Sequence, residues 1–240
     1  MTRAVKAAAL TPMKLSVIIP VYNEEETVGE VLARVLALDV DKEIIVVDDG
    51  STDGTGKVLA QAAAEDPETV IVIKMDTNRG KGAAVRAGIA AAAGNVIAIQ
   101  DADLEYTPEE IPPLLEPIVR GETDVVYGSR FLGARGGNAL HYAGNRVLTF
   151  VTNVLYGTDL TDMETCYKIA RADVLKALSL SSNRFDIEPE ITARLARAGY
   201  RIIEMPVSYD GRSFAAGKKI KWADGFAALW TLVKLRFSKG

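Results

Sequence analysis

The chain has 240 residues, with 28 Lys and Arg against 32 Asp and Glu, so its formal net charge at pH 7 is −4. An apolar fraction of 48% and a charged fraction of 25% are ordinary globular values and exclude a disordered chain. The one cysteine, Cys166, excludes an internal disulfide. No apolar run approaches the roughly 18 residues that cross a bilayer, which taken alone favours a soluble protein.

The first half of the chain alternates short apolar runs with amphipathic or alanine-rich stretches. In chain order these patterns predict strand 15–20, helix 23–38, strand 43–47, helix 55–64, strand 70–74, helix 82–93 and strand 96–100. We expect Asn23 to cap the first helix and Gly94 to stop the third. Regular alternation with short connections predicts an α/β fold, Rossmann-like, with a mostly parallel central sheet and helices on both faces.

The second half is less regular. Its patterns predict strand 124–129, helices 147–155 and 187–198, strand 201–207 and an amphipathic C-terminal helix 221–237. We therefore divide the chain into a flexible leader at 1–13, a catalytic domain at 14–217 and a basic amphipathic helix at 218–240.

The charge is distributed unevenly. Residues 218–240 contain six cationic side chains and one aspartate, a net charge of +5, so the remaining chain carries −9. An acidic body with a basic end suggests an anionic partner at that end, whereas the plainer alternative is a solvated basic tail.

Polar residues follow three of the predicted strands, at 20–24, 48–53 and 101–105. The carboxyl ends of parallel strands meet at one edge of a sheet, so these segments should converge there. Asp101, Asp103 and Glu105 make an oxygen-rich group suited to Mg²⁺ or Mn²⁺, which would neutralise a diphosphate leaving group. The alternative is that Asp103 or Thr107 caps the turn before residues 108–110.

Further candidates are weaker when taken singly. Asp48 and Asp49 suit a ribose or a base edge but also suit a turn, and the Gly-rich segment 78–82 offers Lys81 at a helix start. The spacing there matches neither a P-loop nor a dinucleotide fingerprint. The only histidine, His141, has no neighbouring serine or cysteine motif, which argues against a hydrolase triad, and one Cys and one His exclude a structural zinc site.

Taken together, these segments resemble family 2 glycosyltransferases of the GT-A fold. The later motifs resemble the branch of dolichyl-phosphate mannose synthases and bacterial polyprenyl-phosphate glycosyltransferases. The residues that carry the likeness are 20–24, 47–51, 101–103, 128–131, 162–168, 185–190 and 209–212.

The resemblance implies roles for individual residues. Asp103, Arg130 and Arg212 would be catalytic, Asp101, Asp103 and Glu105 would hold Mg²⁺ or Mn²⁺, and Arg130 and Thr165 would bind the acceptor phosphate. Glu105 stands where the branch often has glutamine. The nucleotide sugar would contact Pro20, Tyr22, Glu24, Asp49, Lys81, Asp101, Ala102, Asp103, Arg212 and Lys218.

The implied reaction moves a sugar, with inversion, from a GDP-mannose or UDP-glucose type of donor to a polyprenyl or dolichyl phosphate. A phosphate acceptor is already anionic near neutral pH, so no general base is required. The alternative is a soluble family 2 enzyme with a sugar or small hydroxyl acceptor, which would need Asp162, Asp186 or Glu188 as base. A third reading is a catalytically silent nucleotide-binding module.

The resemblance also implies a function for the basic C-terminal segment. Residues 221–237 place Trp222, Phe226, Leu229, Trp230, Val233 and Phe237 on one face, which suits a membrane interface. The alternative is a helix packed on the domain, with Trp222 and Phe226 in the core. We expect a cytoplasmic enzyme, peripheral on the cytoplasmic membrane face, that binds no nucleic acid. Helix 147–155 offers a second membrane contact, and homo-oligomer formation stays open.

Overall fold

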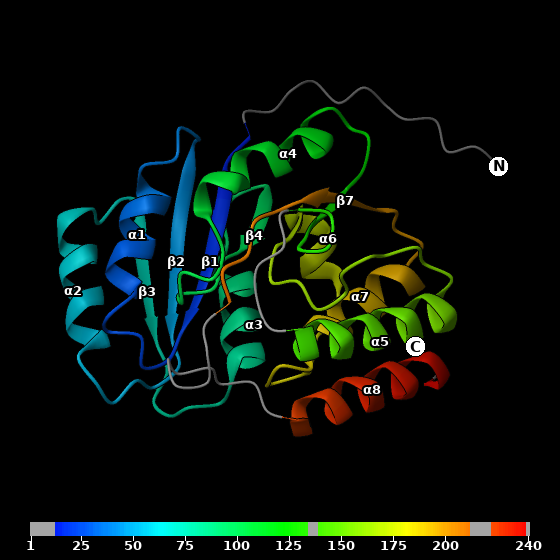
Figure 1. The fold of residues 1–240 in the computed structure, drawn as a ribbon. Coiled ribbons are helices and arrows are strands. Elements are labelled where there is room, and N and C mark those ends of the chain that lie inside the picture. The colour runs from blue at the N-terminus through cyan, green and yellow to red at the C-terminus, as the bar shows by residue number, and fades with distance from the viewer. Residues whose placement is uncertain (1–12, 134–138, 212–221, 239–240) are drawn as a thin grey trace.

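The computed structural model describes residues 13–133, 139–211 and 222–238 (Figure 1). Of the predicted leader, only Met13 falls within this range. None of the helices in these three ranges combines the length and the apolar character that crossing a membrane requires.

A seven-stranded sheet forms the centre of the molecule, in the order β3-β2-β1-β4-β6-β5-β7. Neighbouring strands are parallel except where β6 pairs with β4 and β5. This confirms the mostly parallel sheet, although the sequence patterns missed β6. The strands are β1 Leu15–Val21, β2 Lys42–Asp48, β3 Val70–Lys74, β4 Val96–Ile99, β5 Val125–Ser129, β6 Lys168–Arg171 and β7 Ile202–Pro206.

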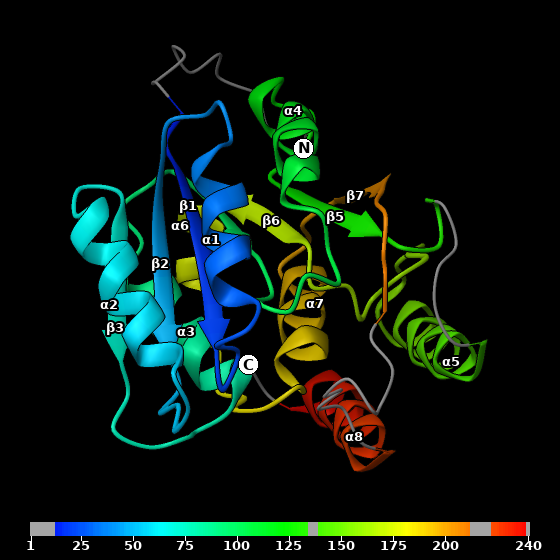
Figure 2. The same cartoon turned by 60° about the vertical axis from the view of Figure 1, so that its left-hand side comes forward.

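Helices cover both faces of the sheet, as predicted (Figure 2). The crossovers from β1 to β2 and from β2 to β3 pass through α1 and α2, whereas the return from β3 to β4 passes through α3 on the other face. The helices are α1 Val28–Leu36, α2 Thr55–Glu65, α3 Lys81–Ala91, the 3-10 turn η1 Pro108–Glu110, α4 Ile111–Val119, α5 Ala139–Tyr156, α6 Ala172–Ala177, α7 Ile187–Arg197 and α8 Trp222–Phe237.

Two predicted helix ends are wrong for physical reasons. Asn23 does not cap α1, because it adopts a left-handed backbone with φ of 51° and its side chain accepts the Thr52 N–H at 2.9 Å. Gly94 does not terminate α3 through a left-handed turn. Its N–H donates to Ser16 Oγ and Glu43 Oε1, and a Cβ on it would lie 2.6 Å from the Lys14 carbonyl oxygen. Glycine is therefore required by close packing against the start of β1.

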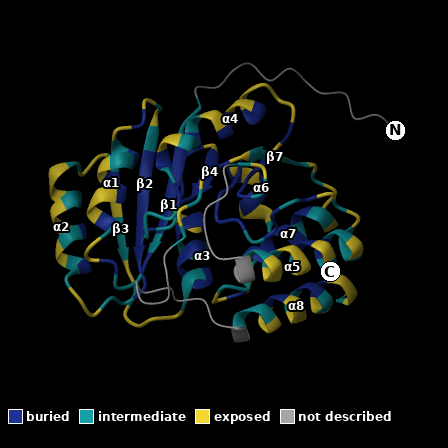
Figure 3. Cartoon of the chain, in the orientation of Figure 1, coloured by how far each residue is buried: buried dark blue, intermediate teal, exposed yellow. Residues whose placement is uncertain are grey.

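The core lies around β1, β2 and β4, whose apolar side chains are buried (Figure 3). Continuous apolar runs such as 15–19 and 44–47 are what a strand covered on both faces requires. Burying these strands fixes where they end. Polar residues directly after them are therefore held at one edge by a rigid frame.

Helix α8 packs on the domain beside α5 and α7 (Figures 1 and 2). Leu232 is fully buried, and its carbonyl oxygen accepts the Tyr156 hydroxyl at 2.6 Å. The buried face consists of Ala228, Leu232 and Leu235, and Phe226, Trp230 and Phe237 of the predicted aromatic face lie exposed on the other side. Phe226 is 74% exposed, so the alternative that placed Phe226 in the core is wrong. The Trp222 side chain lies outside the described structure.

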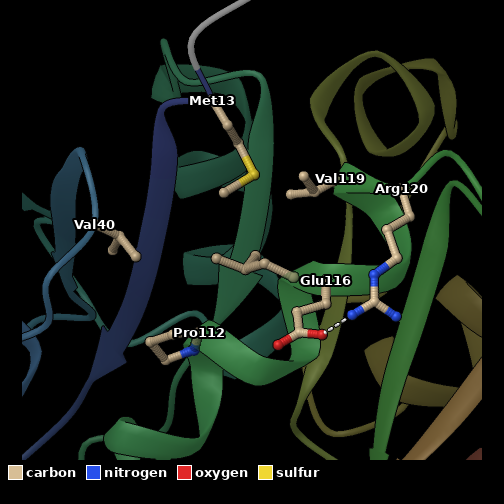
Figure 4. Close-up of a pocket in the computed structure, with 7 residues that line it drawn as sticks. Met13, Val40, Pro112, Glu116, Val119 and Arg120 are labelled. Carbon is tan, nitrogen blue, oxygen red and sulfur yellow. Dashed lines mark hydrogen bonds and ion pairs between the residues drawn. The ribbon is translucent and has the colours of Figure 1, made fainter. Parts of the chain in front are cut away.

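A small apolar hollow lies at the amino ends of β1 and β2, away from the polar edge (Figure 4). Among its walls, Glu116 and Arg120 pair with each other. The remaining lining residues are Met13, Val40, Pro112, Leu115 and Val119. Apolar walls and a self-paired ion pair offer little to a phosphorylated ligand, so we place the candidate site at the other end of the sheet.

Candidate active site

The three polar segments predicted at strand ends do converge. Parallel register sets Val21 beside Asp48 and Ile18 beside Ile99. The Asp49 N–H donates to the Val21 carbonyl at 2.8 Å, and the Asn23 N–H donates to Ser51 Oγ at 3.0 Å. Residues 20–24, 48–53 and 101–105 therefore occupy one edge of the sheet.

Asp49 organises a loop at this edge. Its side chain is buried, and its two carboxylate oxygens accept the N–H groups of Arg79 and Gly80, both at 2.7 Å. Gly80 has φ of 99°, and a Cβ there would lie 2.4 Å from the Asn183 carbonyl oxygen. The contact with a base or ribose that we predicted for Asp49 would have to form beside these two hydrogen bonds.

Pro20, Tyr22 and Glu24, the residues predicted to bind the donor at the end of the first strand, lie along the same edge of the sheet. Glu24 is buried, its N–H donates to Thr55 Oγ1 at 2.9 Å, and its carboxylate accepts the Thr27 hydroxyl at 2.8 Å. Pro20 and Tyr22 are partly exposed there. Glu24 thus ties the start of α1 to α2, while Pro20 and Tyr22 leave surface for a ligand.

Lys81 and Asp101, both predicted to bind the nucleotide sugar, form an ion pair of 2.7 Å. Lys81 is the first residue of α3, and Asp101 follows β4. Burial alone would lower the pKa of Lys81, but the charges of Asp101 and Glu188 outweigh it and hold the pKa well above its usual value. Lys81 therefore keeps its positive charge, while Ala102, the next predicted contact, is buried.

The three carboxylates predicted to hold a metal do not form one cage. Asp101 pairs with Lys81, Glu105 accepts the Tyr209 hydroxyl at 2.5 Å, and Asp103 accepts the Glu105 N–H at 3.2 Å. No cluster of three or more Asp, Glu, His or Cys side chains suited to a metal occurs within the described ranges. The donor set still fits Mg²⁺ or Mn²⁺ held by one or two carboxylates, with phosphate oxygens of a substrate as further ligands.

Arg130 and Asp162 form a buried bidentate pair near this segment. The guanidinium Nε and Nη2 each donate to the carboxylate at 2.7 Å, and the Arg130 N–H donates to the same carboxylate at 3.0 Å. The Tyr209 ring lies 5.1 Å from the guanidinium carbon. Burial opposes the charge on Arg130, but surrounding groups including Asp162 raise its pKa well above the usual value. Tyr209 thereby links Glu105 to Arg130.

Thr165 has a structural role in this geometry. It is fully buried, its hydroxyl donates to the Gly128 carbonyl at 2.5 Å and accepts the Tyr167 N–H at 3.2 Å. These bonds join the residue to β5, which ends just before Arg130. The predicted contact with an acceptor phosphate would require Thr165 to break them.

Two buried ionic residues extend the site behind Lys81. Glu188 on α7 lies 3.1 Å from the Lys81 ammonium and 2.8 Å from the Lys168 ammonium. In the sequence, Glu188 was a candidate only as the base of the alternative reaction, and Lys168 had no predicted role. The short run 168–171 gave no clear strand pattern, and a lysine within it is usually exposed.

Arg146 is a second cation that the sequence analysis did not single out. It lies on α5, and its guanidinium carbon is 5.8 Å from the ring centre of Phe131, the residue after Arg130. The position fell just before the predicted helix 147–155, and only the fold brings it beside 130–131. Arg212 and Lys218, predicted to bind phosphates, lie outside the described residues, as does the side chain of His141.

The comparisons with known proteins agree with this architecture. Structures of glucosyl-3-phosphoglycerate synthase from Mycobacterium tuberculosis, one with phosphoglyceric acid and one with Mn²⁺, UDP and phosphoglyceric acid, both give a TM-score of 0.73. They cover 95% of this chain and 81% and 80% of theirs, at 21% and 20% identity. At this identity the likeness shows the fold, which is GT-A.

Sequence comparison gives the family. The profile described as Glycosyl transferase family 2 matches residues 16–179. An undecaprenyl-phosphate mannosyltransferase of Micrococcus luteus is 35% identical over 217 residues, covering 86% of this chain and 87% of that protein. A polyprenol monophosphomannose synthase of Mycolicibacterium smegmatis is 32% identical over 213 residues, covering 84% and 79%. The chain belongs to glycosyltransferase family 2, as its motifs indicated, and is a glycosyltransferase.

Proposed function

We propose that this enzyme transfers a hexose from a nucleoside-diphosphate sugar to a polyprenyl phosphate. The two relatives named above carry polyprenyl-phosphate or polyprenol substrates in their names. GDP-mannose and UDP-glucose both remain candidate donors. The donor would lie along Asp101 and Asp103, and the acceptor phosphate would lie near Arg130.

One observation carries the proposal: α5 combines a cationic side chain beside residues 130–131 with an exposed apolar surface. Arg146 lies over Phe131, next to Arg130, and further along the same helix Val147, Phe150 and Val154 are all more than half exposed. An amphiphilic lipid phosphate needs a cation for its head and apolar surface for its chain. A soluble sugar acceptor has no use for the second feature.

Helix α8 enlarges this apolar surface. It lies beside α5, and its outer face is exposed (Figure 3). Phe226 and Trp230 are exposed on it, and Lys234 and Arg236 lie in its last turn. Exposed aromatic and aliphatic side chains near cations suit the interface of an anionic membrane. We therefore propose peripheral contact with the cytoplasmic face of a membrane, through α5 and α8 together and not through α8 alone.

The reaction needs no general base, which agrees with the site. Of the side chains considered as bases for a hydroxyl acceptor, Asp162 is held by Arg130 and Glu188 by two lysines, while Asp186 accepts the Arg184 N–H at 3.2 Å. A phosphate oxygen is already anionic near neutral pH. It would attack the anomeric carbon from the face opposite the departing diphosphate, and the configuration would invert.

A divalent ion, Mg²⁺ or Mn²⁺, would neutralise charge on the leaving diphosphate when bound. Asp103 would hold it, with Glu105 or Asp101 and the substrate phosphates as further ligands. Lys81 would stay charged beside Asp101 and offset the carboxylates there. Arg130 and Arg146 would orient the acceptor phosphate.

The test is transfer of radiolabelled sugar from GDP-mannose and from UDP-glucose, each with Mg²⁺ or Mn²⁺, to a short polyprenyl phosphate. The proposal expects a labelled lipid and release of nucleoside diphosphate that depends on the acceptor. Equal release with a soluble sugar or with 3-phosphoglycerate, and no labelled lipid, would favour the soluble-acceptor alternative instead.

A further inference from the structure

Four buried or half-buried charges of alternating sign run through the site. Asp101 lies 2.7 Å from Lys81, Lys81 lies 3.1 Å from Glu188, and Glu188 lies 2.8 Å from Lys168. The side chains of Glu188 and Lys168 are 5% and 1% exposed. Isolated charges at such depth are costly, so each depends on its neighbours in the series.

One end of this series belongs to the donor side of the site. Lys81 opens α3 directly after the loop that Asp49 holds, and its ammonium group contacts Asp101. Glu188 approaches the same ammonium group from α7. Without this second carboxylate, Lys81 would face Asp101 alone, and less would hold it in place.

The other end belongs to the acceptor side. The Lys168 ammonium donates to the carbonyl oxygens of Met163 and Thr165 at 2.8 and 2.5 Å. These residues belong to the segment that starts at Asp162, the partner of Arg130. Lys168 therefore fixes the segment that orients Arg130, and Glu188 holds Lys168.

We infer that Glu188 is a positioning residue for both substrates: its carboxylate ties Lys81, on the donor side, to Lys168, on the acceptor side. The assignment of the two sides rests on the proposed function. In this proposal Glu188 acts through Lys81 and Lys168 and not by contact with a substrate. Its contribution is to hold two cationic side chains, from α3 and β6, in one fixed geometry.

Glu190 provides a matched control two residues away. It lies on the same helix, is equally buried and is also ion-paired, with Arg194 at 2.8 Å. It also accepts hydrogen bonds from the N–H and hydroxyl of Ser181 and from the N–H of Ser182, between 2.6 and 3.1 Å, in a connection before α7. This connection packs against the start of α3 through Asn183, but Glu190 forms an ion pair with neither Lys81 nor Lys168. A change at Glu190 should therefore cost stability and affect the substrates much less than a change at Glu188.

The experiment compares Glu188→Gln and Glu190→Gln in the full chain. Steady-state transfer is measured over a grid of donor and polyprenyl phosphate concentrations, and GDP and UDP are titrated with Mg²⁺ in the absence of acceptor. For Glu188→Gln we expect both KM values and the diphosphate Kd to rise about tenfold or more, as the loss of a charge-assisted contact implies. For Glu190→Gln we expect a lower Tm with all three constants within about twofold of the wild type.

Unchanged constants for Glu188→Gln, or the same kinetic pattern in both variants, would overturn the inference. If Glu188→Gln does not fold, Glu188→Asp decides: its carboxylate is too short to reach both lysines, so at least one constant should rise. A wild type that binds GDP or UDP but labels no lipid refutes the proposed acceptor, and the diphosphate titration then decides on Glu188 alone. A wild type that binds neither diphosphate overturns both proposals.

Discussion

The guanidinium of Arg130 and the carboxylate of Asp162 face each other along two hydrogen bonds of 2.7 Å. The Asp162 side chain is fully buried, and Glu204 receives the N–H groups of Thr161 and Asp162 at 2.6 and 2.9 Å. The pair is therefore held from β7 as well as from β5. A planar, bidentate contact of this kind fixes the direction of the guanidinium, which a single ionic contact would not.

Replacing Asp162 with asparagine should harm both stability and transfer. The change leaves Arg130 charged and buried without its counter-ion, which typically costs about 3 kcal/mol of unfolding free energy. It also lets the guanidinium turn, so the KM for the lipid phosphate should rise. Urea unfolding and steady-state kinetics measure the two effects.

The control for this change is Asp124→Asn. Asp124 lies 3.7 Å from Arg171, and both side chains are about half exposed, so their contact contributes less than about 1 kcal/mol. If Asp124→Asn lowered the free energy of unfolding and raised the KM as much as Asp162→Asn does, burial of the Arg130–Asp162 pair would have no special importance.

Asp103 should be required for transfer but not for folding. The Asp103→Asn variant keeps the shape of the side chain and removes the charge that would hold a divalent ion. We expect kcat to fall by about 100-fold or more, with Tm unchanged within a few degrees. A chelator should have the same effect on the wild type, and added Mn²⁺ should restore the wild type alone. Full activity of the wild type after exhaustive chelation would contradict the metal assignment.

Glu164 should make the protein less stable as pH rises. Burial raises its pKa to about 7 from an ordinary value of 4.5, while Lys168 opposes the shift, and Oε1 is buried with no hydrogen-bond partner among the described residues. Between these two pH values the folded protein retains a proton that the unfolded chain has lost. Stability therefore declines as pH rises from 4.5 to 7 and stays lower above it.

The Glu164→Gln variant removes this titration. At pH 8 it should be more stable than the wild type, by at most about 3 kcal/mol, and near pH 4 the two should be equal. Glu109→Gln is the opposite control, because a hydrogen bond from Arg34 lowers the pKa of Glu109 and its contribution is lost as pH falls. If the free energy of unfolding depended on pH in the same way in Glu164→Gln and in the wild type, the raised pKa of Glu164 would be refuted.

Sequence patterns predicted the strands that carry the site better than they predicted the side-chain contacts within it. Apolar runs and their spacing located six of the seven strands, because a strand buried on both faces must be apolar throughout. The missed strand, β6, is four residues long and begins with the buried Lys168. A buried lysine is stable there because it forms an ion pair with Glu188, twenty residues later in the chain. A local sequence pattern contains no information about such a distant partner.

The helix faces show the same limit. The periodicity of α8 correctly predicts a helix, and Phe226, Trp230 and Phe237 lie on its exposed face, but it did not identify the buried face, which is Ala228, Leu232 and Leu235. Hydrophobicity alone would bury Trp230 and expose Ala228. Close packing against α5 and α7 selects the small and branched residues instead, and this choice depends on neighbours that the helix sequence does not contain.

The exposed apolar side chains of α5 and α8 should control membrane binding. A variant with Phe150→Ser and Trp230→Ser removes two aromatic rings that are each 67% exposed, so the fold should tolerate both changes. We expect a clear loss of flotation with vesicles that contain anionic lipid, and a raised KM for the polyprenyl phosphate with the diphosphate Kd unchanged. Truncation before α8 is a poorer test, because it uncovers the core beneath the buried Leu232.

The control is a variant with Val119→Ser and Ile71→Ser, two exposed apolar residues on α4 and β3, outside the α5–α8 surface. It should float as the wild type does. If it lost flotation to the same degree, general apolar exposure would explain binding, whereas loss confined to the α5–α8 variant places the lipid surface beside Arg146. That position would let the polyprenyl phosphate reach Arg130 while its chain stays in the membrane.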